Sequence, residues 1–212
     1  MAETASGAIG TLSDTDGPVT VIRADGSEIE AQPGTEIFPG DTVITGDGGA
    51  AFVTLADGSE LRLDEFGEMV VDGVDAVTVL QGAFVVIAGM VDGEPSVIVV
   101  QTPSAVVTVD GATLVGLARP EGEESAFTLL PNPDGSLGLV EVATDAGSQL
   151  LLQPYQTTTT VALAEAPGPI IVVADADFTT LYADALGVLG DLAVETAGGD
   201  ASTKEDPPGP VT

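Results

Sequence analysis

Cysteine, histidine and tryptophan are absent from the 212 residues of this chain, and basic residues are few. Without Cys and His, the chain cannot form disulfides, thiolate or imidazole metal sites, or a nucleophile activated by histidine. Only four cations (Arg23, Arg62, Arg119 and Lys204) face 34 acidic residues, which leaves a formal charge of -30. Because phosphate binding needs clustered Lys and Arg, this charge argues against DNA, RNA and anionic lipid as partners and leaves cations and basic proteins open.

Long apolar runs are also missing. No stretch reaches 18 apolar residues, and the densest, residues 76–90, is interrupted by Gln81 and Gly82. The first residues, Met-Ala-Glu-Thr-Ala-Ser-Gly, lack the basic start and the apolar core of a signal peptide. We therefore expect no direct membrane insertion, and a signal for export would have been removed or would lie outside this sequence.

The chain does have an apolar content of 44%, divided into short runs by turn residues. Eight Asp-Gly pairs punctuate it, beginning at Asp16, Asp25, Asp47, Asp57, Asp72, Asp92, Asp110 and Asp134. Asp tolerates left-handed backbone and Gly adopts it without steric cost, so these pairs favour tight turns between strands. The pattern predicts an all-β fold, a turn-rich solenoid-like or sandwich arrangement of short strands.

The expected strands are short and rich in β-branched residues. They cover residues 19–23, 42–45, 51–55, 60–63, 69–71, 77–80, 83–88, 97–101, 106–109, 127–130, 138–143 and 149–152, and residues 157–161 favour extended backbone. Leu61-Arg62-Leu63 keeps the alternation of a strand with one buried face. The unbroken β-branched runs at 97–100 and 106–109 indicate strands that are buried on both faces.

The pattern changes after Pro167-Gly168-Pro169. Asp177 can cap a helix, and large apolar residues then recur at helical spacing, which predicts one C-terminal amphipathic helix within residues 175–197. Its apolar stripe is Phe178, Leu181, Tyr182, Leu186, Leu189 and Leu192. Residues 198–212 are small, polar and rich in Pro, which is the composition of a flexible acidic tail.

Five segments, in order, resemble the motifs of the FecR-like domain family of Gram-negative bacteria. They are Val-Thr-Val-Ile-Arg-Ala-Asp-Gly (19–26), Phe-Pro-Gly-Asp-Thr-Val-Ile-Thr-Gly (38–46), Ala-Phe-Val-Thr-Leu-Ala-Asp-Gly-Ser (51–59), Val-Leu-Gln-Gly-Ala-Phe (79–84) and Thr-Pro-Ser-Ala-Val-Val-Thr-Val-Asp-Gly (102–111). The resemblance covers about residues 9–116. The family's usual Arg-Gly-Thr is replaced by Asp110-Gly111-Ala112-Thr113. The resemblance implies a domain without catalytic residues, found in a periplasmic sensor of ferric citrate signalling and also in extracellular proteins.

Residues 121–135 and 153–160 are similar to a subset of FecR-like proteins that begin without a classical signal peptide. In that subset the domain stands at the start of long acidic surface proteins, which implies an extracellular or cell-surface location in a Gram-negative bacterium. The expected organisation is an N-terminal arm (1–8), the FecR-like β domain (9–116), a β extension (117–166), a Pro/Gly connector and strand (167–174), the helix (175–197) and the tail (198–212).

Two pairs of carboxylates, Asp14 with Asp16 and Asp175 with Asp177, have the spacing found in calcium loops. Roles in turns and helix caps explain the same acids, and neither pair belongs to a complete EF-hand loop. The sequence therefore predicts at most weak calcium binding and no other cofactor.

Two acidic groups, Asp64-Glu65 and the cluster of Glu121, Glu123 and Glu124, could be imagined as the acid and base of a glycosidase. Solvated acidic loops explain them better, because a sugar site normally adds aromatic platforms and this chain has only two Tyr and no Trp. The Thr run at 157–160 is likewise better explained as a strand than as a glycosylated tract. The sequence predicts that the protein is not an enzyme.

The apolar stripe of the helix can pack on the chain's own β body or can dock another subunit or protein. The leading interpretation is a non-enzymatic structural or interaction module of the cell surface that self-assembles into a fibre or forms the base of an adhesin. Its partners would be other copies of itself or another surface protein. The alternative is a periplasmic sensor domain of a FecR-type signalling system, although such a sensor normally has a membrane helix before the domain, which here begins within about ten residues of Met1.

The acidic composition predicts that charge repulsion limits association of the chain with itself. Millimolar calcium, or a pH lowered from 7 toward the sequence pI of about 4.1, should therefore raise light scattering. Sodium chloride at matched ionic strength separates general screening from calcium binding. Flat scattering under every condition would contradict this prediction.

Overall fold

The computed structural model describes residues 7–173. In this range every regular element is a β-strand, so the all-β prediction is confirmed. No helix that could cross a membrane occurs within residues 7–173. The helix predicted within residues 175–197, with its apolar stripe, lies outside the described residues.

Nineteen strands make up the fold, and most are between two and seven residues long. They are β1 (Gly10–Asp16), β2 (Val19–Ile22), β3 (Glu28–Glu30), β4 (Glu36–Ile37), β5 (Asp41–Thr45), β6 (Ala50–Leu55), β7 (Glu60–Leu63), β8 (Glu68–Val71), β9 (Ala76–Ile87), β10 (Met90–Val91), β11 (Glu94–Pro95), β12 (Val97–Gln101), β13 (Val106–Asp110), β14 (Thr113–Ala118), β15 (Ser125–Leu130), β16 (Leu139–Thr144), β17 (Gly147–Leu151), β18 (Gln156–Thr160) and β19 (Ile171–Val172).

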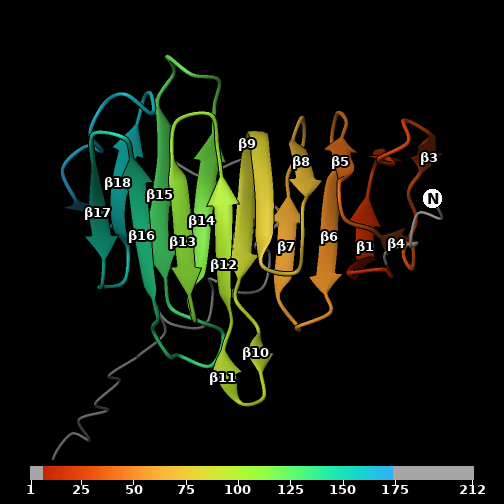
Figure 1. Ribbon diagram of the computed structural model, residues 1–212, viewed down its shortest axis with the longest axis horizontal. Helices are drawn as coiled ribbons and strands as arrows, with labels where there is room; N and C mark the ends of the chain where they lie inside the picture. The colour runs from red at the N-terminus through yellow and green to blue at the C-terminus, as the bar shows by residue number, and fades with distance from the viewer. Residues whose placement is uncertain (1–6, 174–212) are drawn as a thin grey trace, which may run out of the picture.

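Seventeen of these strands form two sheets that pack face to face as a long β-sandwich (Figure 1). Sheet A has the order β4-β1-β6-β7-β9-β14-β15-β18-β19, and sheet B has the order β3-β2-β5-β8-β9-β12-β13-β16-β17. The pairing of β9 with β12 is parallel, and the other described pairings are antiparallel. Strands β10 and β11 form a separate small hairpin that projects from the body.

One long strand, β9, belongs to both sheets. Its first half pairs with β8 and β12 in sheet B, and its second half pairs with β7 and β14 in sheet A. The change of sheet occurs at Gly82, whose φ is +103° and where an added Cβ would lie 2.7 Å from Cα of Gly67. The sequence predicted two strands, 77–80 and 83–88, because Gln81-Gly82 looked like a break; the structure has one bent strand there.

The main core lies between the sheets and is built from alternating positions of the strands. Val43, Leu61, Val107 and Leu129 are among its fully buried members. Phe84 on β9 lies opposite Gly116 on β14, and a Cβ at position 116 would clash with the Phe84 ring. This strand position is therefore restricted to Gly by packing rather than by its backbone angles.

Burial on both faces occurs, but not on the strands that the sequence indicated. Val97 at the start of β12 is 45% exposed and Val106 at the start of β13 is 39% exposed, so each strand has one buried face. All six residues of β15 are buried instead, as are five of the six in β14. A β-branched composition predicts that a segment forms a strand, whereas the burial of that strand depends on what covers each of its faces.

The Asp-Gly pairs form turns as predicted. Seven of the eight glycines have positive φ, the exception being Gly73. In three of these turns the carboxylate is fixed as well, because the hydroxyl and backbone N–H of Ser27, Ser59 and Ser136 donate to Asp25, Asp57 and Asp134. These hydrogen bonds lower the pKa of Asp25 and of Asp134. The stability that each contributes is present above its unfolded-state pKa and is lost as the pH falls through the lower folded-state value.

Replacement of Gly111 by Val should lower the melting temperature by several degrees. Gly111 has a φ of +55°, and an added Cβ would lie 2.7 Å from Cβ of Pro95, so the variant combines backbone strain with a clash. Gly26→Ala is the control, because Gly26 has a φ of +83° but no atom within 4 Å of an added Cβ. Thermal unfolding of both variants should show the larger loss for Gly111→Val, and an unchanged curve would contradict the strained turn.

Candidate binding surface

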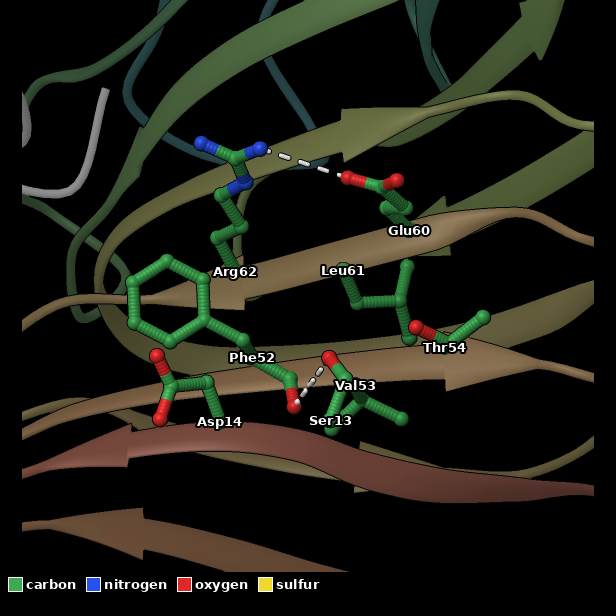
Figure 2. Close-up of a pocket in the computed structure, with 8 residues that line it drawn as sticks. All are labelled: Ser13, Asp14, Phe52, Val53, Thr54, Glu60, Leu61 and Arg62. Atoms are coloured by element: carbon green, nitrogen blue, oxygen red, sulfur yellow. Dashed lines mark hydrogen bonds and ion pairs between the residues drawn. The ribbon is translucent and has the colours of Figure 1, made fainter. Parts of the chain in front are cut away.

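A shallow hollow of about 230 Å³ lies on the outer face of sheet A, over β1, β6 and β7 (Figure 2). Its lining residues are Ser13, Asp14, Phe52, Val53, Thr54, Glu60, Leu61 and Arg62. The volume falls below the range of roughly 300–1,000 Å³ that is usual for small-molecule pockets. The hollow therefore suits a single side chain or a small polar group.

Strand register creates this site. Phe52 on β6 is the cross-strand partner of Asp14 on β1 and of Arg62 on β7, so the three side chains stand in one row. A bulge in β1 between Leu12 and Asp14 sets the position of the acid, and the hydroxyl of Ser13 in this bulge donates to the carbonyl of Phe52 at 3.2 Å. Bulges of this kind commonly redirect a side chain at a binding surface.

Arg62 is held from two sides. Its guanidinium lies 5.5 Å from the centroid of the Phe52 ring, and its Nη2 lies 3.2 Å from Oε2 of Glu60, two residues away on the same strand face. Figure 2 shows the ring between the guanidinium and the carboxylate of Asp14. Arg62 is one of only four basic residues in the sequence, and here it serves to order an aromatic ring and an acid.

The charges of the hollow favour a cationic guest. Arg62 already has Phe52 and Glu60 as partners, whereas Asp14 is exposed and accepts one hydrogen bond, from the backbone N–H of its neighbour Thr15 at 2.9 Å. Two carboxylates thus stand at the rim of a recess that has one aromatic ring. This arrangement can accept a Lys or Arg side chain of another protein, and it does not bring together groups for proton transfer.

A second Arg has a structural role. Arg23 donates to the carbonyl of Glu36 at 2.8 Å and to the carboxylate of Asp41, and it lies 5.1 Å from the centroid of the Phe38 ring. Asp41 is buried and also accepts the backbone N–H of Phe38 at 2.8 Å. This network fixes the turn Phe38-Pro-Gly-Asp41. The segment belongs to the motif at residues 38–46, and its salt bridge was not predicted from the sequence.

Of the acids considered as calcium ligands, Asp14 and Asp16 lie within the described residues and do not gather with a third acid. Asp14 and Asp16 both lie on β1 and are exposed. No group of three or more His, Cys, Asp or Glu side chains that could hold a metal occurs within residues 7–173. Asp175 and Asp177 lie outside the described residues, so calcium binding there stays a prediction.

The acids considered for glycoside hydrolysis lie on separate loops and have local roles. Glu65, between β7 and β8, accepts the backbone N–H of Gly48 at 2.8 Å. Glu123 lies between β14 and β15, and its Oε2 is 3.7 Å from Nη1 of Arg119. The Thr run at 157–160 forms strand β18, as predicted.

The two free edges of sheet B differ in character. At one end, β3 has the sequence Glu-Ile-Glu, and such charges discourage strand pairing between molecules. At the other end, β17 (Gly-Ser-Gln-Leu-Leu) has no charged residue, and Leu150 and the following Leu152 are 44% and 53% exposed. The edge at β17 is thus the one that is open to another strand.

Comparison with known proteins gives a family match and a shared fold. Residues 41–131 match the family model described as FecR protein. Two crystal structures of a candidate anti-sigma factor from Parabacteroides distasonis ATCC 8503 align with TM-scores of 0.50 and 0.51 at 22% and 23% identity, covering 66% and 67% of this chain. The alignments span 62% and 63% of those chains, less than two thirds of their length, and show the shared fold alone.

A third solved structure, a cell surface anchoring domain, is 33% identical over 30% of this chain and 83% of its own. Its TM-score is 0.29, so it carries no argument about this protein. No curated protein matches the chain.

The stacking of Arg62 on Phe52 can be measured by a double-mutant cycle. Phe52→Leu and Arg62→Met should show a coupling of about 0.5–1 kcal/mol in the free energy of unfolding, as expected for a partly exposed cation–π pair. The same cycle with Glu60→Gln in place of Phe52→Leu is the control and should give a smaller, salt-dependent value, because that ion pair is solvated. Additive effects of Phe52→Leu and Arg62→Met in denaturant unfolding would contradict the stacking.

Proposed function

Because residues 41–131 match the FecR family model, we propose that this chain is the protein-binding sensor domain of a FecR-type signalling system and acts outside the cytoplasm. The match begins at the first residue of β5 and ends directly after β15, so it covers the central part of the sandwich, including the shared strand β9. FecR-like domains are regulatory rather than catalytic, which agrees with the expectation that the chain is not an enzyme.

The family and the fold favour this function over a fibre or an adhesin. Both crystal structures that share the fold are named as those of a candidate anti-sigma factor, a regulatory protein. The leading interpretation from the sequence, a self-assembling surface module, has no comparable support. The alternative from the sequence, the sensor domain, is therefore the function that we propose.

The observation that carries the protein-binding part of the proposal is the uncharged free edge at β17. In the two-residue hairpin that joins β16 and β17, Thr144 pairs with Gly147, and Val142 with Gln149. The alternation of an antiparallel ladder then directs the backbone groups of Ser148 and Leu150 away from β16. Free N–H and C=O groups beside an exposed leucine are what β-augmentation by a partner strand requires.

The chemistry of the partner follows from the charge of this chain. At a formal charge of -30, a partner that is rich in Lys and Arg gains in association rate, and an acidic one is repelled. We propose a protein that adds an extended apolar strand to β17 and carries basic residues beside it. The acidic hollow at Asp14 and Glu60 is a second point at which such a partner can place a basic side chain.

Ser148→Pro tests both the edge and the signalling role. Proline removes the outward N–H of residue 148 but leaves the hydrogen bonds between β16 and β17, so the melting temperature should fall by no more than a few degrees. In the bacterium that encodes the chain, this variant and an in-frame deletion of residues 41–131 should change the transcripts of the same set of genes. Ser148→Ala, which keeps the N–H, is the control and should leave those transcripts at wild-type levels.

Should Ser148→Pro lose more stability than expected, Leu150→Lys disturbs the same edge through charge instead. An unchanged transcript profile in the deletion strain, together with loss of cell attachment, would overturn the signalling role and favour a surface module. A deletion that changes transcripts while both edge variants do not would instead place recognition elsewhere on the domain.

A further inference from the structure

The outer face of sheet A has a second apolar cluster, separate from the core between the sheets. Its buried members are Ala83, Val85, Val115, Ala126, Leu130 and Val173, and Ile87, Leu117 and Tyr155 pack against them while partly exposed. They come from β9, β14 and β15 and from the residues that flank β18 and β19. A sheet in a two-layer sandwich normally has one solvated face, so this cluster needs an explanation.

Exposure values show that this face is covered. Val115 is 0% exposed and Val85 is 1% exposed, although both side chains point away from the core between the sheets. On the outer face of sheet B, by contrast, Val99 and Thr108 at the centre of their strands are only partly buried. Neighbours within one sheet therefore do not bury an outward side chain completely, and a further layer must lie over β14 and β15.

No strand in residues 7–173 supplies that layer. All members of the cluster belong to sheet A or directly adjoin its strands, and the small β10–β11 hairpin is exposed. The described chain ends inside the cluster, at Val173, whose backbone N–H donates to the carbonyl of Tyr155 at 3.0 Å. The residues that follow Val173 thus start at the margin of the covered face.

We propose that residues 178–195 form an amphipathic helix whose apolar stripe packs across this face, over β9, β14, β15 and β18. The stripe is Phe178, Leu181, Tyr182, Leu186, Leu189 and Leu192. The inference goes beyond the signalling function and does not depend on it.

The dimensions of the two surfaces agree. Four neighbouring strands are about 15 Å wide at a spacing of about 4.8 Å. A helix of this length extends for about 27 Å at 1.5 Å per residue, so it spans all four strands. The five residues from Val173 to Phe178 reach up to about 17 Å when extended, enough to bring the start of the helix over the cluster.

The chemistry of the face also fits an apolar helix. Five of its six buried members are Ala or Val, which leave room for the larger Phe, Leu and Tyr side chains of the stripe. The buried hydroxyls of Thr128 and Thr157 on this face bond to each other at 2.7 Å, and that of Thr113 donates to the side-chain carbonyl of Asn132 at 2.8 Å. Because these polar atoms are already paired, an apolar layer can cover them without leaving a donor or acceptor unsatisfied.

Cross-linking of paired cysteines tests the proposal directly, since the chain has no cysteine of its own. Leu117→Cys on the face is combined with Leu186→Cys or with Leu189→Cys in the full chain, and each double variant is treated with a short bismaleimide. We expect an intramolecular product at monomer mass for at least one pair. Thr108→Cys on the outer face of sheet B, combined with the same helix positions, is the matched control and should give none.

A second measurement does not depend on the choice of cysteine positions. Leu186→Asp together with Leu189→Asp should lower the melting temperature by several degrees and raise the binding of a dye specific for apolar surface. Asp184→Asn together with Asp191→Asn changes the opposite side of the predicted helix and should leave both readings near wild type.

Other occupants of the face would give different results. Cross-links found only at dimer mass would overturn the intramolecular helix and assign the face to a second copy of the chain. Absence of cross-links, together with an unchanged melting temperature and dye signal in the Leu186/Leu189 variant, would show that another partner or segment covers the face.

Discussion

The passage of β9 from one sheet to the other is the constraint on which the rest of the sandwich depends. In sheet A, β9 lies between β7 and β14, and in sheet B it lies between β8 and β12. The strands before it and the strands after it are therefore joined through β9 in both layers. The turn in the strand at Gly82 and the close packing of Phe84 on Gly116 set the spacing and angle of both halves. A change at either glycine would act on the whole molecule.

Much of the fold could be predicted from short-range pattern. Residues 60–63 and 97–101 are strands with the predicted bounds, because alternation and turn chemistry act over a few residues. Strand β1 was missed because it is polar apart from Leu12, and its place in the sheet comes from pairing with the distant β6. Strand β14 was missed because Gly116 weakens the sequence pattern of a strand. A glycine is required at this position because the ring of Phe84, far away in the sequence, packs against it.

Only part of the candidate site could be predicted from short-range sequence patterns. The pairing of Phe52 with Arg62 follows from the Asp57-Gly58 turn between β6 and β7, so counting outward from that turn could have found it. The approach of Asp14 could not be found in this way, since it depends on a bulge in β1 and on a pairing between strands far apart in the sequence. Asp14 drew attention as a calcium ligand by its spacing from Asp16, and the structure places it in register with Phe52.

The end of the sandwich that holds β14 to β19 has two surfaces without charge. There, sheet A has an outer face that is covered, and sheet B has a free edge without charge, while the opposite end is closed by the short, acidic strand β3. Most of the 34 acids must be solvated, and their repulsion would keep copies of the chain apart unless some surfaces lack charge. The face and the edge are such surfaces, and they belong to different sheets. A segment that covers the face of sheet A therefore leaves β17 open. The chain can thus bury its own apolar face while the edge of β17 remains free to pair with a strand of a partner.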